Sequence, residues 1–273
     1  MDIKIIVAVV CYHNEDEVIK FANMISKQTI KKHIYLVITY NSGNRFEYLK
    51  TNIEKLDILA NIFNPYGNLG YLSGCCFGVD ADKDMLKNNT WIAISNTDIE
   101  FETTDFLEKI IENVPKDVWA IGPRIKLKDT KQEQNPFFEK RPSVQSMKFR
   151  NFFYSNLLLY NSYFILSKIK TKLLVKKEDI YKKSRFVYAL HGSFFIVNKQ
   201  LFEKIDKVKN HIFMYGEELL VAELVNKNNK HCYFRNDITI IHNENQVTSS
   251  LSNKRKQTWF NQSINYLTTN YFT

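Results

Sequence analysis

The stretch WIAISNTDIEF, from Trp91 to Phe101, places a polar segment directly behind an apolar one. Its first five residues have the composition of a buried strand, and the carboxylate of Asp98 follows shortly after that strand ends. Open α/β sheets bind ligands at the carboxyl ends of their strands, so a strand that ends on a carboxylate is expected at an active site. A solvated loop carboxylate is the alternative, and the rest of the chain decides between the two.

Strand and helix patterns alternate along the first 125 residues of the chain. Such alternation predicts an α/β fold with a central, mostly parallel sheet flanked by helices. Apolar runs predict strands at 3–10, 34–39, 59–63, 91–95 and 118–122, and helical spacing predicts helices at 15–28, 45–56, 72–86 and 105–112. The patterning returns after residue 185, with strands at 194–197, 232–234 and 238–241, helices at 199–205 and 217–228, and a helical tail after Ser252.

The bulk composition is that of a soluble globular protein. The chain has 273 residues, 44% of them hydrophobic and 25% charged, which suffices for a single large domain. Its four cysteines lack the spacing of a zinc site or a disulfide framework, and the first residues lack the basic start of a signal peptide. We therefore expect free thiols and a cytoplasmic location, with secretion as the alternative.

Nearly the whole net charge of +9 comes from one segment. Between Lys148 and Arg185, ten Lys or Arg residues are opposed by only two acids. The same segment holds the uncharged, aromatic run 151–167, which is too short and too polar to span a membrane. An apolar run followed by lysines predicts peripheral contact with an anionic membrane through 148–185. A helical insertion packed on the core and a homodimer contact are the alternatives, and we expect no nucleic-acid partner because no recognition motif is present.

Polar residues gather where the predicted strands end. Tyr-His-Asn at 12–14 follows the first strand, the polar run 40–44 closes the second, and Asn-Thr-Asp at 96–98 follows the fourth. Between them, NPYGNLGYLSGCCFG (64–78) contains glycines that let the backbone approach a ligand closely, and a helix starts just behind it. The sequence therefore predicts a ligand site at this edge of the sheet.

Five segments occur in a characteristic order: VVCYHNED (9–16), NLGYLSGCCFG (68–78), SNTDIEF (95–101), HGSFFIVNKQLFEKI (191–205) and FMYGEELLVAELVNKNNKHCYFRNDITIIH (213–242). Together they resemble the motifs of family 2 glycosyltransferases with the GT-A fold, in the branch of bacterial rhamnosyl- and galactofuranosyltransferases. The resemblance implies a single GT-A domain over 1–273. Its parts would be a nucleotide-binding half (1–125), a basic and aromatic insertion (126–185), an acceptor and catalytic half (186–252) and a helical tail (253–273).

The resemblance also implies a reaction. A sugar would pass with inversion from a nucleotide-diphosphate donor, dTDP-rhamnose or a UDP-hexose, to a hydroxyl of a glycan or lipid-linked acceptor in bacterial surface polysaccharide synthesis. Asp98, with His242 as a second ligand, would hold a divalent cation, Mn²⁺ or Mg²⁺. Glu218 would activate the acceptor as general base, with Glu217 as the alternative. Contacts to the acceptor would come from His191 and Gly192. The residues implied in binding the nucleotide sugar are Tyr12, Asn14, Tyr40, Asn41, Asn68, Gly70, Gly74, Asn96 and Asp98.

Some of these residues also suit other interpretations. Glu217 and Glu218 would complement the dipole of a helix that begins there. Tyr40 and Asn96 stand where the family usually has acids, which leaves open a weakened transferase retained as a binding or scaffold subunit. A sugar nucleotidyltransferase is a further alternative, but it would need a Gly-rich, basic loop where this chain has CYHNEDEV at 11–18.

Overall fold

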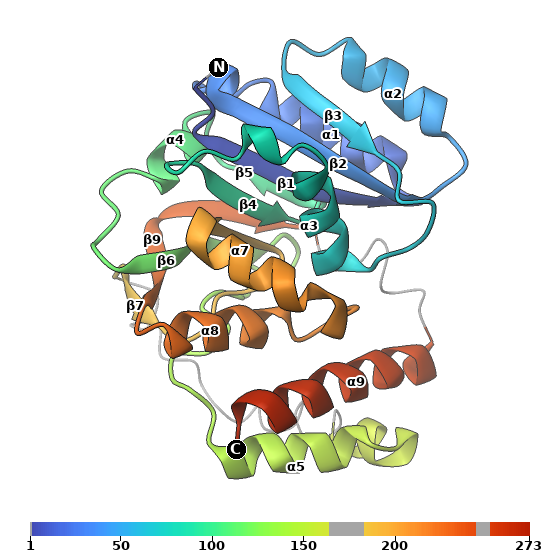
Figure 1. The fold of residues 1–273 in the computed structure, drawn as a ribbon, viewed down its shortest axis with the longest axis vertical. Coiled ribbons are helices and arrows are strands. Elements are labelled where there is room, and N and C mark those ends of the chain that lie inside the picture. The colour runs from blue at the N-terminus through green and yellow to red at the C-terminus, as the bar shows by residue number, and fades with distance from the viewer. Residues whose placement is uncertain (1, 164–182, 244–251) are drawn as a thin grey trace.

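The computed structural model describes residues 2–163, 183–243 and 252–273. Figure 1 shows a curled sheet with helices on both faces and a pair of helices at one end of the molecule. The strands are β1 (Ile5–Tyr12), β2 (Ile34–Ser42), β3 (Leu59–Phe63), β4 (Trp91–Ser95), β5 (Ile99–Phe101), β6 (Val118–Leu127), β7 (Arg185–Val187), β8 (Phe194–Asn198) and β9 (His231–His242). The helices are α1 (Glu15–Ile25), α2 (Phe46–Glu54), α3 (Tyr71–Ala81), α4 (Phe106–Ile110), α5 (Val144–Tyr154), α7 (Lys199–Val208), α8 (Glu217–Lys227) and α9 (Asn253–Tyr271).

The sheet has the strand order β3-β2-β1-β4-β8-β6-β9-β5, and β7 pairs with β9. Its first half is parallel, because β1 pairs in parallel with both β2 and β4, and β2 with β3. In the second half, β8 runs antiparallel to β4 and β6, whereas β6 and β9 are parallel. The predicted α/β architecture with a helix-flanked sheet is confirmed.

Strand β1 shows why the apolar runs form central strands. Its side chains alternate between two cores, with Ile6 and Ala8 on one face and Ile5 and Val7 on the other. Helices α3, α7 and α8 cover the first face, and α1, α2 and α4 cover the second. A strand that is buried on both faces needs apolar residues at every position, as the sequence has here.

Several predicted elements differ from the structure in their end residues, and two differ in how the chain is divided. The strands expected at 232–234 and 238–241 form one strand, β9, whose ladder with β6 passes from Arg235 directly to Thr239. The polar residues Asn236 and Asp237 lie in this bulge, and their turn-like composition produced the predicted break. The helix expected at 72–86 ends at Ala81, and a separate 3₁₀ turn, Lys83–Met85, follows it.

The basic and aromatic segment contributes helix α5, which packs against α9 at the lower end of Figure 1. Ser143 caps α5 by accepting a hydrogen bond from the Ser146 N–H, and Ser252 caps α9 in the same way through the Arg255 N–H. The lysines between 168 and 182 lie outside the described residues. No helix among the described residues is both long and apolar enough to cross a membrane.

Candidate active site

A cavity of about 630 Å³ lies where β1, β2 and β4 end. Its wall also includes the start of α8, the end of β9, and residues of α5 and α9. The predicted site residues that line it are Tyr12, Asn14, Asn41, Asn68, Gly70, Asn96, Asp98, His191, Gly192, Glu217, Glu218 and His242. Residues from distant parts of the sequence thus meet at one place, as expected from strand ends that share an edge of a sheet.

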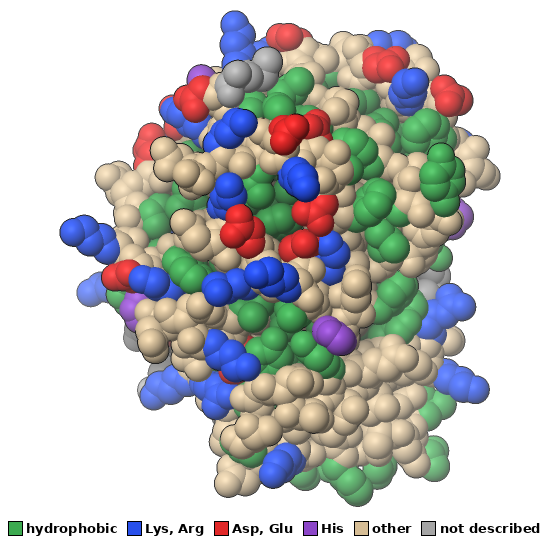
Figure 2. All heavy atoms as spheres, in the orientation of Figure 1, with side chains coloured by type: hydrophobic (Ala, Val, Ile, Leu, Met, Phe, Trp, Pro, Cys, Tyr) green, Lys and Arg blue, Asp and Glu red, His purple; other side chains and the backbone are tan. Residues whose placement is uncertain are grey.

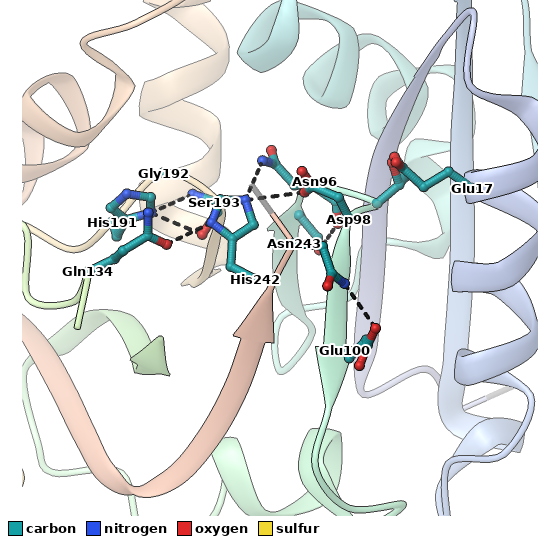
Figure 3. A network of polar contacts seen from close by, with 12 residues as sticks. Glu17, Asn96, Asp98, Glu100, Gln134, His191, Gly192, Ser193, His242 and Asn243 are labelled. Carbon is teal, nitrogen blue, oxygen red and sulfur yellow. Dashed lines mark hydrogen bonds and ion pairs between the residues drawn. The ribbon is translucent and has the colours of Figure 1, made fainter. Parts of the chain in front are cut away.

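Asp98 and His242 are brought together by the pairing of β5 with β9. Ile99 lies opposite His242 in this ladder, and the Asn243 N–H donates to the Asp98 carbonyl oxygen at 2.8 Å. The two side chains therefore meet, with Asp98 Oδ1 3.2 Å from His242 Nε2 (Figure 3). Both are largely buried, with side-chain exposures of 15% and 5%. Asp98 and His242 are far apart in the sequence, and the register of β5 with β9 brings them together.

The surroundings of His242 leave its Nε2 facing the carboxylate. Its other ring nitrogen, Nδ1, lies 2.7 Å from Gln134 Oε1, an acceptor, so Nδ1 carries the proton. The Asn96 side-chain nitrogen approaches Nε2 at 3.5 Å. Asp98 Oδ1 is buried and accepts no hydrogen bond from the described residues. Two electron-rich atoms thus face each other and would be stabilised by a cation between them.

This geometry fits a divalent cation. Mg²⁺ binds oxygen at about 2.1 Å in octahedral geometry, which separates neighbouring ligand atoms by about 3 Å. The 3.2 Å between Asp98 and His242 matches that spacing. No cluster of three or more His, Cys, Asp or Glu residues suited to a metal occurs in the described part of the chain. The pair therefore suits a cation that takes its remaining ligands from substrate phosphates and water.

Glu217 and Glu218 open helix α8 directly behind Gly216, whose φ of 102° turns the chain into the helix. Burial, followed by the charge of Glu218, raises the pKa of Glu217 well above its usual value. Burial also raises the pKa of Glu218, although backbone hydrogen bonds at Gly192 and Gly216 oppose that shift. A carboxyl group whose pKa is raised towards pH 7 is suited to accept a proton from a substrate hydroxyl.

The segment 191–193 forms the wall beside these acids. The Tyr71 hydroxyl donates to the Gly192 carbonyl at 2.9 Å, and the Asn96 N–H donates to the Ser193 carbonyl at 2.8 Å. Burial, followed by the proximity of the His242 ring, lowers the pKa of His191 to about 3, so His191 is neutral. The segment therefore ties the acidic pair to the region around Asp98.

Two predicted nucleotide-binding residues, Tyr40 and Gly74, do not line the cavity. The Tyr40 ring is buried against Phe46, and its hydroxyl donates to Glu15 Oε1 at 2.9 Å. Gly74 lies on α3, where an added Cβ would stand 3.1 Å from the Asn41 amide nitrogen. Both residues therefore pack against other residues next to the cavity and do not line it.

Glu17 is a cavity residue that the sequence reading missed. Its carboxylate accepts hydrogen bonds from Thr97 and, at 2.8 Å, from Asn14. Burial, opposed by these hydrogen bonds and assisted by the nearby charge of Asp98, raises the pKa of Glu17. In the sequence, Glu17 is one of three consecutive acids in the first turn of α1, which is an ordinary helix start.

The cavity wall formed by α5, α9 and 213–215 was also missed. It includes Arg150, Tyr154, Phe213, Tyr215, Arg255, Trp259 and Phe260. The aromatic content of 148–185 is visible in the sequence, which favours a membrane surface there and leaves a helical insertion packed on the core and a homodimer contact as alternatives. Only the packing of α5 on α9 shows that part of it faces inward.

Replacing Glu217 by Gln should stabilise the protein at pH 8 but not near pH 4. Because the folded-state pKa of Glu217 is raised, its ionised form destabilises the fold increasingly as pH rises above the unfolded value of about 4.3. We expect Tm to rise by about 2–4 °C at pH 8, the effect of roughly 1 kcal/mol in a chain of this size. Scanning calorimetry at both pH values measures this. Glu54→Gln, on an exposed position of α2, should leave Tm unchanged, and a lower Tm of the Glu217 variant at pH 8 would contradict the prediction.

Comparisons with known proteins identify the fold. Neither the scan against protein-family models nor the search of curated proteins gives a match. Among solved structures, the chain is similar to the crystal structure of GalNAc-T7 with UDP, GalNAc and Mn²⁺, with a TM-score of 0.61 and 12% sequence identity. The similarity covers 97% of this chain and 47% of that one, so this chain spans about half the length of its structural relative. The predicted GT-A fold is thereby confirmed.

Proposed function

We propose that this chain is a glycosyltransferase that uses a nucleotide-diphosphate sugar and a divalent cation. One observation carries the proposal: the pair Asp98 and His242 and the acids Glu217 and Glu218 line the same cavity. The first pair suits a cation that neutralises a diphosphate, and the second suits activation of a hydroxyl. The structural similarity to GalNAc-T7, which was crystallised with UDP, GalNAc and Mn²⁺, supports this proposal.

The metal-binding and donor-binding roles in the proposed reaction fall to separate residues of this chain. Asp98 and His242 would hold the cation, which would offset the charge of the departing diphosphate. The strand-end residues Asn14, Asn41 and Asn96 contact the nucleotide sugar. Asn41 is fixed for this role because its amide nitrogen donates to the Gly70 carbonyl at 2.8 Å. The donor would therefore lie along the ends of β1, β2 and β4.

Glu218 takes the proton of the acceptor hydroxyl. The hydroxyl oxygen then bonds to the anomeric carbon as the bond to the diphosphate breaks, and this single displacement inverts the configuration. Glu217 is buried beside Glu218, and burial followed by the charge of Glu218 raises the pKa of Glu217, so a proton is readily held at the pair. Backbone hydrogen bonds at Gly192 and Gly216 orient the Glu218 carboxylate. His191 and Gly192 line the cavity and would contact the acceptor.

The finer assignments follow from the sequence resemblance. The donor is dTDP-rhamnose or a UDP-hexose, and the acceptor is a glycan or lipid-linked oligosaccharide in bacterial surface polysaccharide synthesis. The protein acts in the cytoplasm as a hexosyltransferase, at the inner face of the membrane. Phe149, Phe152 and Leu158 support membrane contact, since they are 55%, 60% and 76% exposed on or just after α5. Figure 2 shows hydrophobic side chains at the edge of the molecule where Figure 1 draws α5. A homodimer contact through the same surface is the alternative.

The function is tested by thermal-shift screening with nucleoside diphosphates in the presence and absence of Mn²⁺. A ligand that binds only the folded state increases the free energy of unfolding by mass action, by about 2.7 kcal/mol at a hundredfold excess over Kd, and thereby raises Tm. We expect a Mn²⁺-dependent rise with UDP or dTDP and its loss in Asp98→Ala. Asp105→Ala, which removes a partly buried acid outside the cavity, should keep the rise. If no nucleotide shifts Tm of the wild-type protein, the proposal fails and the scaffold interpretation replaces it.

A further inference from the structure

Two arginines differ from all the others in this chain. Five of the seven form ion pairs with Asp or Glu, and these are Arg45, Arg124, Arg141, Arg185 and Arg235. The other two, Arg150 and Arg255, form no ion pair with any described carboxylate, and both line the cavity. Arg150 lies over the Phe138 ring at 4.9 Å, and Arg255 over the Trp259 ring at 6.0 Å. Their guanidinium groups are thus supported by aromatic faces and remain available to a ligand.

The cavity is divided by charge. Its acidic residues, Glu17, Asp98, Glu217 and Glu218, come from α1, from the end of β4 and from the start of α8. Arg150 and Arg255 come from α5 and α9, which pack against each other. Figure 1 draws these two helices on the far side of α8 from β1, β2 and β3. The two arginines therefore enter the cavity wall from other elements than those that end in the polar strand-end residues.

Aromatic contacts fix this wall against the segment that leads into α8. Tyr215 stacks on Phe260 with ring centroids 4.2 Å apart, and Phe213 packs on Trp259 at 5.0 Å. The Ser263 hydroxyl donates to the Met214 carbonyl at 3.3 Å. Because 213–216 runs directly into Glu217, the position of α9 is tied to the position of the proposed base. A group bound on α5 and α9 would therefore be held in register with Glu218.

A guanidinium presents a planar set of donors that matches the oxygens of a carboxylate or phosphate. Aromatic side chains such as Trp259 and Tyr154 supply flat apolar faces to the same part of the cavity. With the proposed donor at the strand ends, this wall is left for the second substrate. We infer that Arg150 and Arg255 bind an anionic group, a phosphate or a carboxylate, carried by the acceptor. The inference rests on the proposed function and narrows the acceptor to acidic or phosphate-linked glycans.

The test is calorimetric titration of three small probes: a hexose 1-phosphate, a methyl hexuronoside and a neutral methyl hexoside. Each is titrated into protein that is saturated with Mn²⁺ and the nucleoside diphosphate that raises Tm most. We expect an anionic probe to bind at least about tenfold more tightly than the neutral one, since hydrogen bonds to charged groups are the stronger ones. Tighter binding of the phosphate probe indicates a phosphate-linked acceptor, and tighter binding of the uronoside indicates an acidic sugar.

Matched variants locate the effect. Arg150→Gln and Arg255→Gln should each lower the affinity for the anionic probe about tenfold and leave the affinity for the neutral probe unchanged. Lys148→Gln and Lys254→Gln remove the same charge from exposed positions of the same two helices, outside the cavity. These two variants should bind the anionic probe and the neutral probe with wild-type affinity. The nucleotide-dependent rise in Tm should persist in all four variants, which shows that the fold and the donor site are intact.

Three results would overturn the inference. They are equal affinity for charged and neutral probes, equal losses in the arginine and lysine variants, and anion binding that disappears once nucleotide is bound. The last would assign the two arginines to the donor. Failure of the proposed function looks different, because no nucleotide would then raise Tm, and the probes titrated without nucleotide would still report on Arg150 and Arg255.

Discussion

Replacing Glu218 by Gln should lower the rate of sugar transfer by about 10²–10⁴-fold, the usual contribution of a positioned general base. The amide keeps nearly the same shape but cannot accept the proton of the acceptor hydroxyl. Binding of the nucleotide and Mn²⁺ should be unchanged, because Asp98 and His242 are intact. The measurement is steady-state transfer, together with the thermal shift as a check on the donor site.

The pH dependence and a neighbouring variant make this prediction specific. Burial raises the pKa of Glu218, and a base acts only when deprotonated, so kcat of the wild type should fall as pH decreases through that raised pKa. In Glu218→Gln the residual rate should lose this dependence. Glu217→Gln should reduce transfer much less. If Glu217→Gln loses the larger part of the transfer rate instead, Glu217 is the base. If neither variant loses activity, Glu217 and Glu218 do not act in proton transfer.

Replacing Gly192 by Ala should lower kcat by about 10²-fold with little change in nucleotide affinity. A Cβ at this position would lie 2.7 Å from Glu218 Oε1 and 3.1 Å from Glu217 Oε1. The flexible carboxylates can move away, so the fold should survive while the base shifts from its place. A displacement of about 1 Å at a reacting group costs on the order of 10²-fold in rate.

Gly67→Ala is the matched control for Gly192→Ala. A Cβ at Gly67 meets no atom within 4 Å, and Gly67 is not part of the cavity wall. Its kcat and Tm should equal those of the wild type. Wild-type kcat in Gly192→Ala would mean that the positions of Glu217 and Glu218 do not matter for transfer. A large loss of Tm would mean that this glycine serves folding instead.

The sequence was most informative about the sheet and the residues at its edge. The continuous apolar run of β1 predicted a strand buried on both faces, and the polar residues at the strand ends predicted where side chains would gather. Asp98 and His242 were paired in advance through the family resemblance, and the structure places them 3.2 Å apart. Their roles in metal binding, like those of Glu217 and Glu218 in catalysis, stay predictions.

What the sequence could not supply depends on packing between distant segments. Tyr40 stands at a strand end, but only the structure shows that its ring faces Phe46 and its hydroxyl faces Glu15. Glu17 looks like a helix-start residue until Thr97 and Asn14 are placed beside it. Arg150 and Arg255 are 105 positions apart and meet the cavity only because α5 packs on α9. No local pattern encodes such contacts.

The wall that α9 contributes sets the order in which the cavity can form during synthesis. Tyr12 and Trp259 line the same space, and a ribosome that adds roughly 5–20 residues per second separates them by roughly 10–50 s. Until then Tyr215 lacks the Phe260 ring on which it stacks, and the nascent chain exposes an aromatic surface next to a completed sheet. Exposed hydrophobic surface of this kind is what chaperones bind. The complete cavity can therefore form only after α9 has been synthesised.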